Sequence, residues 1–332
     1  MSAPAPSMYS PAAREMASRL GLKMGKTNLE AFADTLLALA RTNRDILAVT
    51  SDSRGSGKLG PFGQALPEQI VELGIAEQNL VGVSAGLASC GKAVFAVSPA
   101  CFLTARALEQ IKNDVAYSDN PVNVIGISAG VSYGALGSTH HSLHDLAALR
   151  AINNIDVVAP ADNVETRAVI EIAATRRKPT YVRFGKAPLH DLPSPEIKFE
   201  IGKARTVRNG TDVCLIGTGE TVIHALLAAE SLADSGVSCR VISMHTIKPL
   251  EVEAVVRAGT ECGAVVTVEE HSVHGGLGEA CAAVLLQAGV RTRFKIVGIP
   301  DEYTVTGSQA DIFCHYGITM EGLSQTAKSL LK

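Results

Sequence analysis

A single glutamate, Glu77, follows a short apolar run in the segment ELGIAEQNLVG (72–82), where a helix is expected to begin. A carboxylate desolvated by apolar neighbours can share a proton with a bound ligand and so take part in acid–base chemistry. An acidic residue in the first turn of a helix also has a purely structural explanation, because the helix dipole stabilises it by about 0.3–1 kcal/mol. The local pattern alone favours the structural explanation.

Three histidines gather in the segment GALGSTHHSLHD (134–145), which follows an apolar strand. His140 and His141 are adjacent, and His144 comes shortly after them. In doubly wound sheets ligands bind at the carboxyl ends of the strands, and a histidine there can move protons or hydrogen-bond a substrate oxygen. Capping of the next helix, or simple exposure to solvent, is the alternative explanation. Zinc binding is a weaker alternative, because this spacing, with no cysteine or carboxylate clearly completing it, is not a ligand pattern.

Two glycine-rich segments lack the spacing of nucleotide-binding motifs. The segment SDSRGSGKLG (51–60) has Asp52 where a P-loop requires glycine and Leu59 where it requires serine or threonine. The segment GTGE (217–220) does not match GxGxxG and favours a tight turn between a strand and a helix. The seven cysteines form no CxxC pair, which favours a reducing compartment and gives no cysteine-based metal site.

Alternating strands and helices must position these residues. Apolar residues at helical spacing in 27–43 precede a buried strand at 45–52, and the alternation continues to the Pro-rich stretch KAPLHDLPSPEIKF (186–199). Beyond this predicted linker the alternation resumes. The pattern predicts an α/β fold with a doubly wound, mostly parallel sheet, followed by a smaller α/β domain. We predict domains over 27–192 and 193–332, after a loose, Pro-rich N-terminal extension over 1–26.

The composition limits the class of protein. A chain of 332 residues with 46% hydrophobic residues is expected to fold into two globular domains. The formal net charge of −3 creates no long-range field that would attract nucleic acid or an anionic membrane surface. We find neither an apolar run long enough to span a bilayer nor the apolar core of a secretory signal, and therefore expect a cytoplasmic location.

Several long segments resemble transketolases and the related 1-deoxyxylulose-5-phosphate synthases, in the same order along the chain. The resemblance runs from about residue 27 to residue 325. It implies that 27–192 is a thiamine diphosphate pyrimidine-binding domain and that 193–332 is a transketolase C-terminal domain. The segments that carry it are LGIAEQNLVGVSAGLASCGKAVFAVSPACFLTARALEQIKNDVA, THHSLHDLAALRAINNIDVVAPADNVE, TIKPLEVE and, for the C-terminal domain, TVEEHSVHGGLGEA.

The resemblance implies cofactor-binding and catalytic roles for particular residues. In the family, the glutamate of the AEQ motif hydrogen-bonds N1′ of the aminopyrimidine ring of thiamine diphosphate, which favours the imino tautomer that deprotonates the thiazolium C2. Glu77 matches this glutamate. Phe102 matches the aromatic residue that stacks on the aminopyrimidine, and Asp52 matches an acidic residue in the preceding strand-end loop. His140 matches the histidine of the THQ motif, which contacts the substrate near the reacting carbon. Glu77 and His140 are thus the predicted catalytic residues.

Further residues are expected to bind substrate. Ser56 matches a serine that contacts the substrate phosphate, and Lys186 aligns with an anion-binding arginine. His141, next to His140, is a further candidate.

The chain lacks the motif that binds the diphosphate end of the cofactor. Full-length transketolases hold the diphosphate and Mg²⁺ in an N-terminal domain through a GDG motif, and no GDG occurs in this sequence. Mg²⁺ requires several oxygen ligands, and without the GDG motif this chain cannot complete the cofactor site. We therefore predict no metal site formed by this chain alone. The resemblance therefore implies the C-terminal subunit of a split transketolase. Its partner would be an N-terminal subunit that carries the GDG motif and most of the Mg²⁺ ligands, in an α2β2 assembly.

The sequence departs from the family where the substrate binds. Leu136 occupies the position of an aspartate that reads a hydroxyl of the donor, and Ser128 replaces a phosphate-binding histidine or arginine. Only Lys26 lies near the position of another anion-binding arginine. We predict transfer of a two-carbon ketol unit from a ketose to an aldose, with a donor other than the standard xylulose 5-phosphate, such as a branched sugar phosphate or a sulfo-sugar. The alternatives are a 1-deoxyxylulose-5-phosphate synthase-like enzyme, the beta subunit of a 2-oxoacid dehydrogenase and a non-catalytic regulatory homologue.

Overall fold

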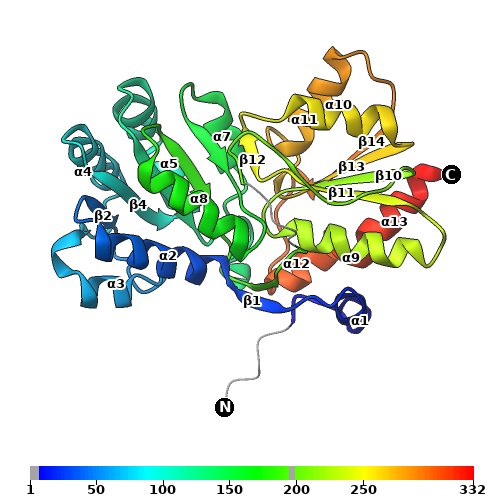
Figure 1. Cartoon of the computed structure of the whole chain (residues 1–332), viewed down its shortest axis with the longest axis horizontal. Helices are drawn as coiled ribbons and strands as arrows, with labels where there is room; N and C mark the ends of the chain where they lie inside the picture. The colour runs from blue at the N-terminus through cyan, green and yellow to red at the C-terminus, as the bar shows by residue number, and fades with distance from the viewer. Residues whose placement is uncertain (1–6, 194–198) are drawn as a thin grey trace.

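The computed structural model describes residues 7–193 and 199–332, which form two α/β units packed side by side (Figure 1). One unit is built on a seven-stranded sheet and the other on a five-stranded sheet. Both sheets are mostly parallel, which confirms the predicted fold class. Residues 1–6 and 194–198, in the predicted extension and the predicted linker, lie outside the described residues.

The larger sheet has the strand order β12-β6-β7-β5-β4-β2-β3, and only β12 is antiparallel to its neighbour. β2 and β4 are neighbours, but the chain continues from β2 to β3 on one side and from β4 to β5 on the other. A switch point of this kind leaves a crevice at the carboxyl ends of the strands. The strands are β2 (Ile46–Thr50), β3 (Ile70–Glu72), β4 (Ala93–Pro99), β5 (Val122–Ile127), β6 (Asp156–Val158), β7 (Thr180–Arg183) and β12 (Thr246–Lys248).

Helices cover both faces of this sheet, which explains why all six residues of β5 are buried. The apolar side chains of α2 (Asn28–Thr42) and α8 (Asn163–Thr175) pack on one face. The other face is covered by α4 (Glu77–Ser89), α5 (Ala100–Arg106), η2 (Ile111–Tyr117) and α7 (Asp145–Ala151). The remaining short helices of the unit are α3 (Gly60–Ala65), η1 (Pro67–Gln69), α6 (Leu108–Gln110) and η3 (Gly134–Leu136).

The smaller sheet has the order β14-β13-β10-β11-β9, with β9 antiparallel to β11. Helices α9 and α13 pack on one face, and α10 and α11 on the other. The strands are β9 (Arg205–Arg208), β10 (Val213–Gly217), β11 (Cys239–Ser243), β13 (Ala264–Ser272) and β14 (Arg293–Ile299). The helices are α9 (Thr221–Ala233), α10 (Val252–Glu261), α11 (Leu277–Gln287), α12 (Gln309–His315) and α13 (Met320–Leu331).

Short segments tie the two units together. β12 comes from the second half of the chain but joins the first sheet, where Thr246 lies opposite Val158. β1 (Met24–Thr27) pairs with β8 (Pro188–His190), a strand inside the predicted linker. The prediction of a loose N-terminal extension is wrong for the described residues from 7 onward, because α1 (Pro11–Arg19) packs against α9.

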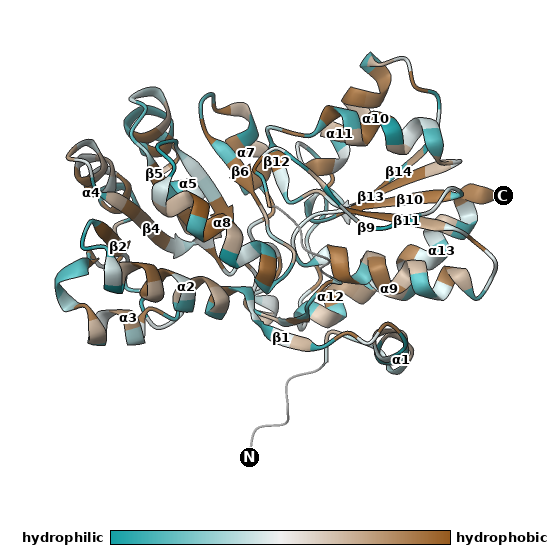
Figure 2. Cartoon of the chain, viewed as in Figure 1, coloured by the Kyte–Doolittle hydropathy of each residue, from teal (hydrophilic) through white to brown (hydrophobic). Residues whose placement is uncertain are grey.

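The hydropathy of the chain follows this architecture. Figure 2 shows hydrophobic residues concentrated on the strands of both sheets and on the helix faces turned toward them. Within residues 7–193 and 199–332, we find no helix with the length and apolar character that crossing a membrane requires.

Candidate functional site

A pocket of about 300 Å³ opens at the carboxyl ends of four neighbouring parallel strands, β3, β2, β4 and β5. Each of these strands is followed by a loop or helix that contributes side chains to the pocket. The pocket thus lies at the switch point of the sheet, where α/β proteins of this type bind ligands. Its lining residues are Asp52, Ser53, Ser56, Ile75, Glu77, Pro99, Phe102, Arg106, Tyr133, Leu136 and His140.

The pocket brings together five of the seven residues that the sequence analysis singled out. Asp52 and Ser56 come from the loop after β2, and Glu77 comes from the first turn of α4. Phe102 lies on α5, and His140 lies in the loop after β5. The chain therefore assembles one site from residues that are almost 90 positions apart in the sequence, 140 − 52 = 88.

Glu77 is a buried residue that lines this pocket. Its side chain is only 4% exposed, although Glu77 is the first residue of α4. Arg106 Nη1 donates a hydrogen bond of 2.9 Å to its Oε1. A solvated charge that only stabilises a helix start would remain in water, so the structural explanation of the local pattern does not describe Glu77. The carboxylate is instead desolvated, paired with one cation and accessible from a cavity.

Aromatic rings form the wall next to Glu77. The guanidinium carbon of Arg106 lies 4.3 Å from the centroid of the Phe102 ring. His140 meets Phe102 edge to face, with ring centroids 5.2 Å apart, and meets Tyr133 in the same manner at 5.4 Å. Thr139 Oγ1 lies 3.0 Å from His140 Nδ1, which leaves Nε2 of His140 available to a ligand.

The other predicted residues do not line the pocket. His141 is buried behind it, where Nε2 lies 3.0 Å from the carbonyl oxygen of Gly134, and burial lowers the pKa of His141. Lys186 packs its ammonium group 4.6 Å from the centroid of the Tyr133 ring, so it lies one side chain away from the cavity. His144 is exposed at the start of α7, which agrees with the structural explanation of that histidine.

Arg106 is the charged pocket residue that was not singled out from the sequence. It lies four residues after Phe102 on α5, and residues at this spacing share one face of a helix. Because Phe102 is a candidate for binding the cofactor ring, this four-residue spacing is the feature of the sequence that could have indicated Arg106 as a residue of the same pocket.

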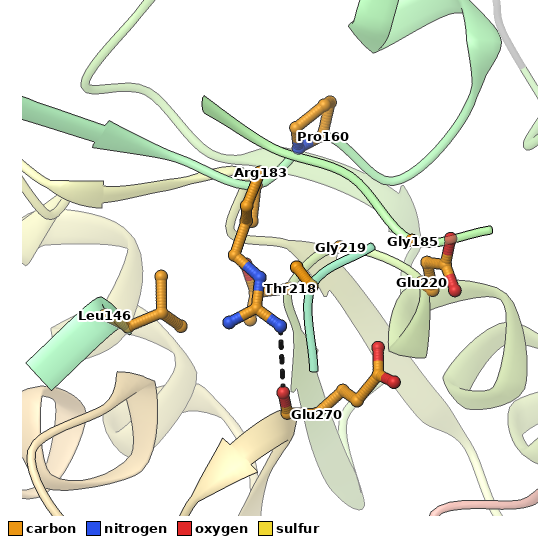
Figure 3. A pocket seen from close by; sticks show the side chains of 10 residues that line it. Leu146, Pro160, Arg183, Gly185, Thr218, Gly219, Glu220 and Glu270 are labelled. Carbon is orange, nitrogen blue, oxygen red and sulfur yellow. Dashed lines mark hydrogen bonds between the residues drawn. The ribbon is translucent and has the colours of Figure 1, made fainter. Parts of the chain in front are cut away.

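A second group of buried polar residues lies between the two units, around a cavity of about 20 Å³ (Figure 3). Arg183, at the end of β7, donates hydrogen bonds of 2.8 Å to Asp145 Oδ1 and 3.0 Å to the carbonyl oxygen of Glu270. Gln309 Nε2 lies 3.0 Å from Glu220 Oε2 and 2.9 Å from Glu270 Oε1. The bond from Arg183 to the Glu270 carbonyl joins the first unit to the second, as does the hydrogen bond of 2.8 Å that the Val131 backbone amide donates to Glu270 Oε1. All of these residues except Val131 contribute buried polar side chains.

Burial raises the pKa of two carboxyl groups of this cluster above the ordinary value. Burial, and secondarily the charge of Glu220, raises the pKa of Glu270 to about 8. Burial raises the pKa of Glu220 to about 7, against hydrogen bonding by Gln309 and the charge of Arg183. The folded protein therefore binds protons near neutral pH that the unfolded chain, with ordinary glutamates, has already released.

This proton uptake gives the stability of the chain a definite pH dependence. Between the ordinary value of 4.5 and about 8, the folded state holds a proton on Glu270 that the unfolded state lacks, so stability falls as the pH rises through this window. Glu270→Gln removes the titrating group and keeps an amide of similar shape. We expect the unfolding temperature of the variant, relative to that of the unmodified chain, to increase from pH 5 to about pH 8 and then to level off.

Differential scanning fluorimetry with an external dye over this pH range measures the effect. Glu253→Gln on the exposed side of α10 is the matched control, and its profile should run parallel to that of the unmodified chain. A parallel profile for Glu270→Gln as well would show that Glu270 does not titrate in this window.

The chain matches two family profiles that together cover most of its length. Residues 25–190 match the transketolase pyrimidine-binding domain, and residues 202–323 match the transketolase C-terminal domain. The division of the chain into 1–26, 27–192 and 193–332 remains a prediction, because the family profiles give matched ranges rather than domain boundaries.

Curated proteins and a solved structure are similar over nearly the whole chain. An apulose-4-phosphate transketolase subunit of Phocaeicola vulgatus is 49% identical over 304 residues, which cover 91% of this chain and 97% of that protein. The 6-deoxy-6-sulfo-D-fructose transketolase subunit of a Clostridium species is 36% identical over 280 residues, covering 82% and 87% of the two chains.

The solved structure is a split gene transketolase described as an inactive beta4 tetramer. It superposes with a TM-score of 0.82 at 35% identity and covers 92% of this chain and 98% of its own. The pocket at the switch point, the two matched domains and the full-length similarity to separate subunits lead to one conclusion. The chain belongs to the transketolase family and is a transketolase subunit of the split type, composed of the pyrimidine-binding and C-terminal domains.

Proposed function

We propose that the pocket around Glu77 binds the aminopyrimidine end of thiamine diphosphate and catalyses transfer of a two-carbon ketol unit from a ketose to an aldose. The observation that carries the proposal is a carboxylate, 4% exposed, which faces the same cavity as an aromatic ring and a histidine. An aminopyrimidine has a flat face that can stack on Phe102 and a ring nitrogen that can share a proton with Glu77. The residues present thus fit this end of the cofactor.

The diphosphate end is assigned to a partner subunit. We propose that an N-terminal transketolase subunit, which carries a GDG motif, supplies most of the ligands of Mg²⁺, because this chain has no GDG. Within the described residues, no group of three or more His, Cys, Asp or Glu side chains is arranged to hold a metal ion. Asp52, exposed at the mouth of the pocket, is proposed to contact the cofactor from this chain.

Exposed apolar side chains at the rim of the pocket support such a partner. Ile75 is 72% exposed and Leu136 is 56% exposed, although both line the cavity. A partner that covers them would remove apolar surface from water and would close the pocket to solvent. We propose an α2β2 assembly in the cytoplasm, where the seven cysteines, all free thiols in the structure, would remain reduced.

The residues of this chain would then have distinct tasks. The chemistry that bound thiamine diphosphate supplies is a carbon nucleophile for the ketose carbonyl. Glu77 holds a proton at the pyrimidine nitrogen, and Phe102 fixes the plane of that ring. His140 Nε2 hydrogen-bonds the substrate near the reacting carbon. Ser56 lies at the pocket mouth and Lys186 lies behind Tyr133, where they would attract the anionic end of a sugar.

The proposed donor is a branched ketose phosphate of the apulose 4-phosphate class. Leu136 lines the pocket where the family carries an aspartate that reads a donor hydroxyl, and an apolar side chain there tolerates a different substitution at the sugar carbon. The relative that is 49% identical is described as an apulose-4-phosphate transketolase subunit. A sulfo-sugar donor, which the name of the 36% identical relative suggests, is the second candidate.

Donor preference tests the proposal. The chain is reconstituted with its GDG-containing partner, thiamine diphosphate and Mg²⁺, and kcat/KM is measured for apulose 4-phosphate, 6-deoxy-6-sulfofructose and xylulose 5-phosphate with one aldose acceptor. We expect a preference of about tenfold or more for apulose 4-phosphate over xylulose 5-phosphate, corresponding to about 1.4 kcal/mol in the transition state. Leu136→Asp should reduce this preference.

Two outcomes would contradict the proposal at different levels. Equal kcat/KM values for the three donors would refute the assigned donor but not the reaction class. Release of CO₂ from pyruvate, without ketol transfer, would instead favour the 1-deoxyxylulose-5-phosphate synthase-like or 2-oxoacid dehydrogenase alternative.

A further inference from the structure

The guanidinium group of Arg106 occupies the space between the two groups proposed to bind the cofactor ring. It donates a 2.9 Å hydrogen bond to the Glu77 carboxylate and at the same time lies 4.3 Å from the centroid of the Phe102 ring. Because one planar group makes both contacts, the face of Phe102 that it covers is the face next to Glu77. A second planar ring cannot stack there and reach the same carboxylate oxygen while Arg106 stays in place.

Burial of Glu77 explains why the arginine is held there. A carboxylate that is 4% exposed and unpaired would be strongly unfavourable, and Arg106 supplies the opposite charge. Within the described residues, Arg106 is the cation within ion-pairing distance of Glu77. The aromatic face of Phe102 adds a cation–π contact to the guanidinium. The two contacts hold the side chain in the pocket.

Arg106 is also able to leave. Its side chain is 48% exposed, and it lies at the last residue of α5, so rotation about its own side-chain bonds would carry the guanidinium to solvent without movement of the helix. The backbone groups that position Phe102 and Glu77 would remain where they are.

On the basis of the proposed function, we propose that Arg106 is a placeholder that occupies the aminopyrimidine site in the cofactor-free protein and is displaced when thiamine diphosphate binds. It is a positioning residue, which keeps the buried carboxylate of Glu77 in a paired state until the cofactor ring replaces it. The fraction of molecules in which Arg106 has swung out then limits the apparent affinity for the cofactor. Removal of the placeholder should therefore strengthen cofactor binding.

The affinity of the reconstituted complex for thiamine diphosphate tests this inference. Isothermal titration calorimetry in excess Mg²⁺ compares the unmodified complex with complexes that carry Arg106→Met or Arg106→Gln. We expect the Kd to fall by about fivefold or more in both variants, because the competing state loses its stabilising contacts. Arg41→Met, which removes an exposed positive charge on α2, is the control and should leave the Kd unchanged.

The stability of the cofactor-free chain provides an independent readout. Arg106→Met should lower the unfolding temperature by several degrees, because it leaves Glu77 unpaired. In a Glu77→Gln background the same substitution should have a much smaller effect, since the neutral amide needs no partner. Equal effects in both backgrounds would show that the ion pair is not what holds Arg106.

The outcomes separate this inference from the proposed function. A Kd that is unchanged or higher in both Arg106 variants would overturn the inference, because Arg106 would then be neutral toward the cofactor or would help to bind it. If the unmodified complex fails to bind thiamine diphosphate at all, the proposed function fails, and the placeholder role fails with it.

Discussion

Replacement of Glu77 by glutamine is expected to lower the rate of ketol transfer by about 10²–10⁴-fold in the complex with the N-terminal partner. Glutamine keeps the shape of the side chain but cannot share a proton with a pyrimidine nitrogen in the same way. Because Glu77 is buried, water cannot take over this role. The loss should appear in kcat at saturating cofactor and substrate, measured by the formation of the product sugar phosphate.

Glu72→Gln is a suitable control for this experiment. Glu72 is an exposed carboxylate at the end of β3, five residues before Glu77, and does not line the pocket. Its replacement should leave kcat within about twofold, as expected for surface substitutions away from a site. A Glu77→Gln complex that keeps normal kcat would exclude proton sharing by Glu77.

Arg183→Met is expected to destabilise the folded chain by about 3–5 kcal/mol, because it breaks a buried ion pair and leaves one charge without a partner. The Asp145 side chain is fully buried, and its two oxygens accept hydrogen bonds from Arg183 and from the Tyr181 hydroxyl, the latter at 2.6 Å. Arg183 also reaches the Glu270 carbonyl in the other unit, so the substitution weakens the contact between the units as well (Figure 3). Urea unfolding followed by far-UV circular dichroism gives the free energy.

An ion pair at the surface provides the comparison. Lys92 Nζ lies 2.6 Å from Asp45 Oδ1, and the two side chains are 38% and 63% exposed. Lys92→Met should therefore cost about 1 kcal/mol or less. If the Arg183 and Lys92 variants lose the same stability, the buried cluster does not hold the two units together.

The position of the candidate site could be predicted because it depends on strand ends. Glu77, Phe102 and His140 each follow an apolar strand, and the carboxyl ends of parallel strands meet at one edge of a sheet. The resemblance to transketolases then selected these residues among other polar ones at that edge. His141 lies next to His140 in the sequence but does not line the pocket, because its ring is buried with Nε2 3.0 Å from the carbonyl oxygen of Gly134.

Contacts that depend on side-chain conformation or on distant pairing could not be predicted in this way. The pairing of Arg106 with Glu77 requires a particular rotamer of the arginine side chain. The strand β12 has only three residues, and its partner strand, β6, lies almost 90 residues earlier in the sequence, 246 − 158 = 88. The helix α1 did carry a local indication, since Ser10 caps it and Pro11 occupies its first turn. The cluster around Glu270 joins residues from both units, and no single segment reveals it.

The most direct test of the central claim is the fate of the two-carbon unit. The chain and its GDG-containing partner are mixed with thiamine diphosphate, Mg²⁺, an apulose 4-phosphate donor labelled with ¹³C at its first two carbons, and an aldose acceptor. Mass spectrometry then follows the label. We predict that both labelled carbons appear together in a new ketose only when both chains are present, and that Glu77→Gln largely abolishes the transfer. Label that appears as CO₂, or transfer by the isolated chain without its partner, would contradict the account.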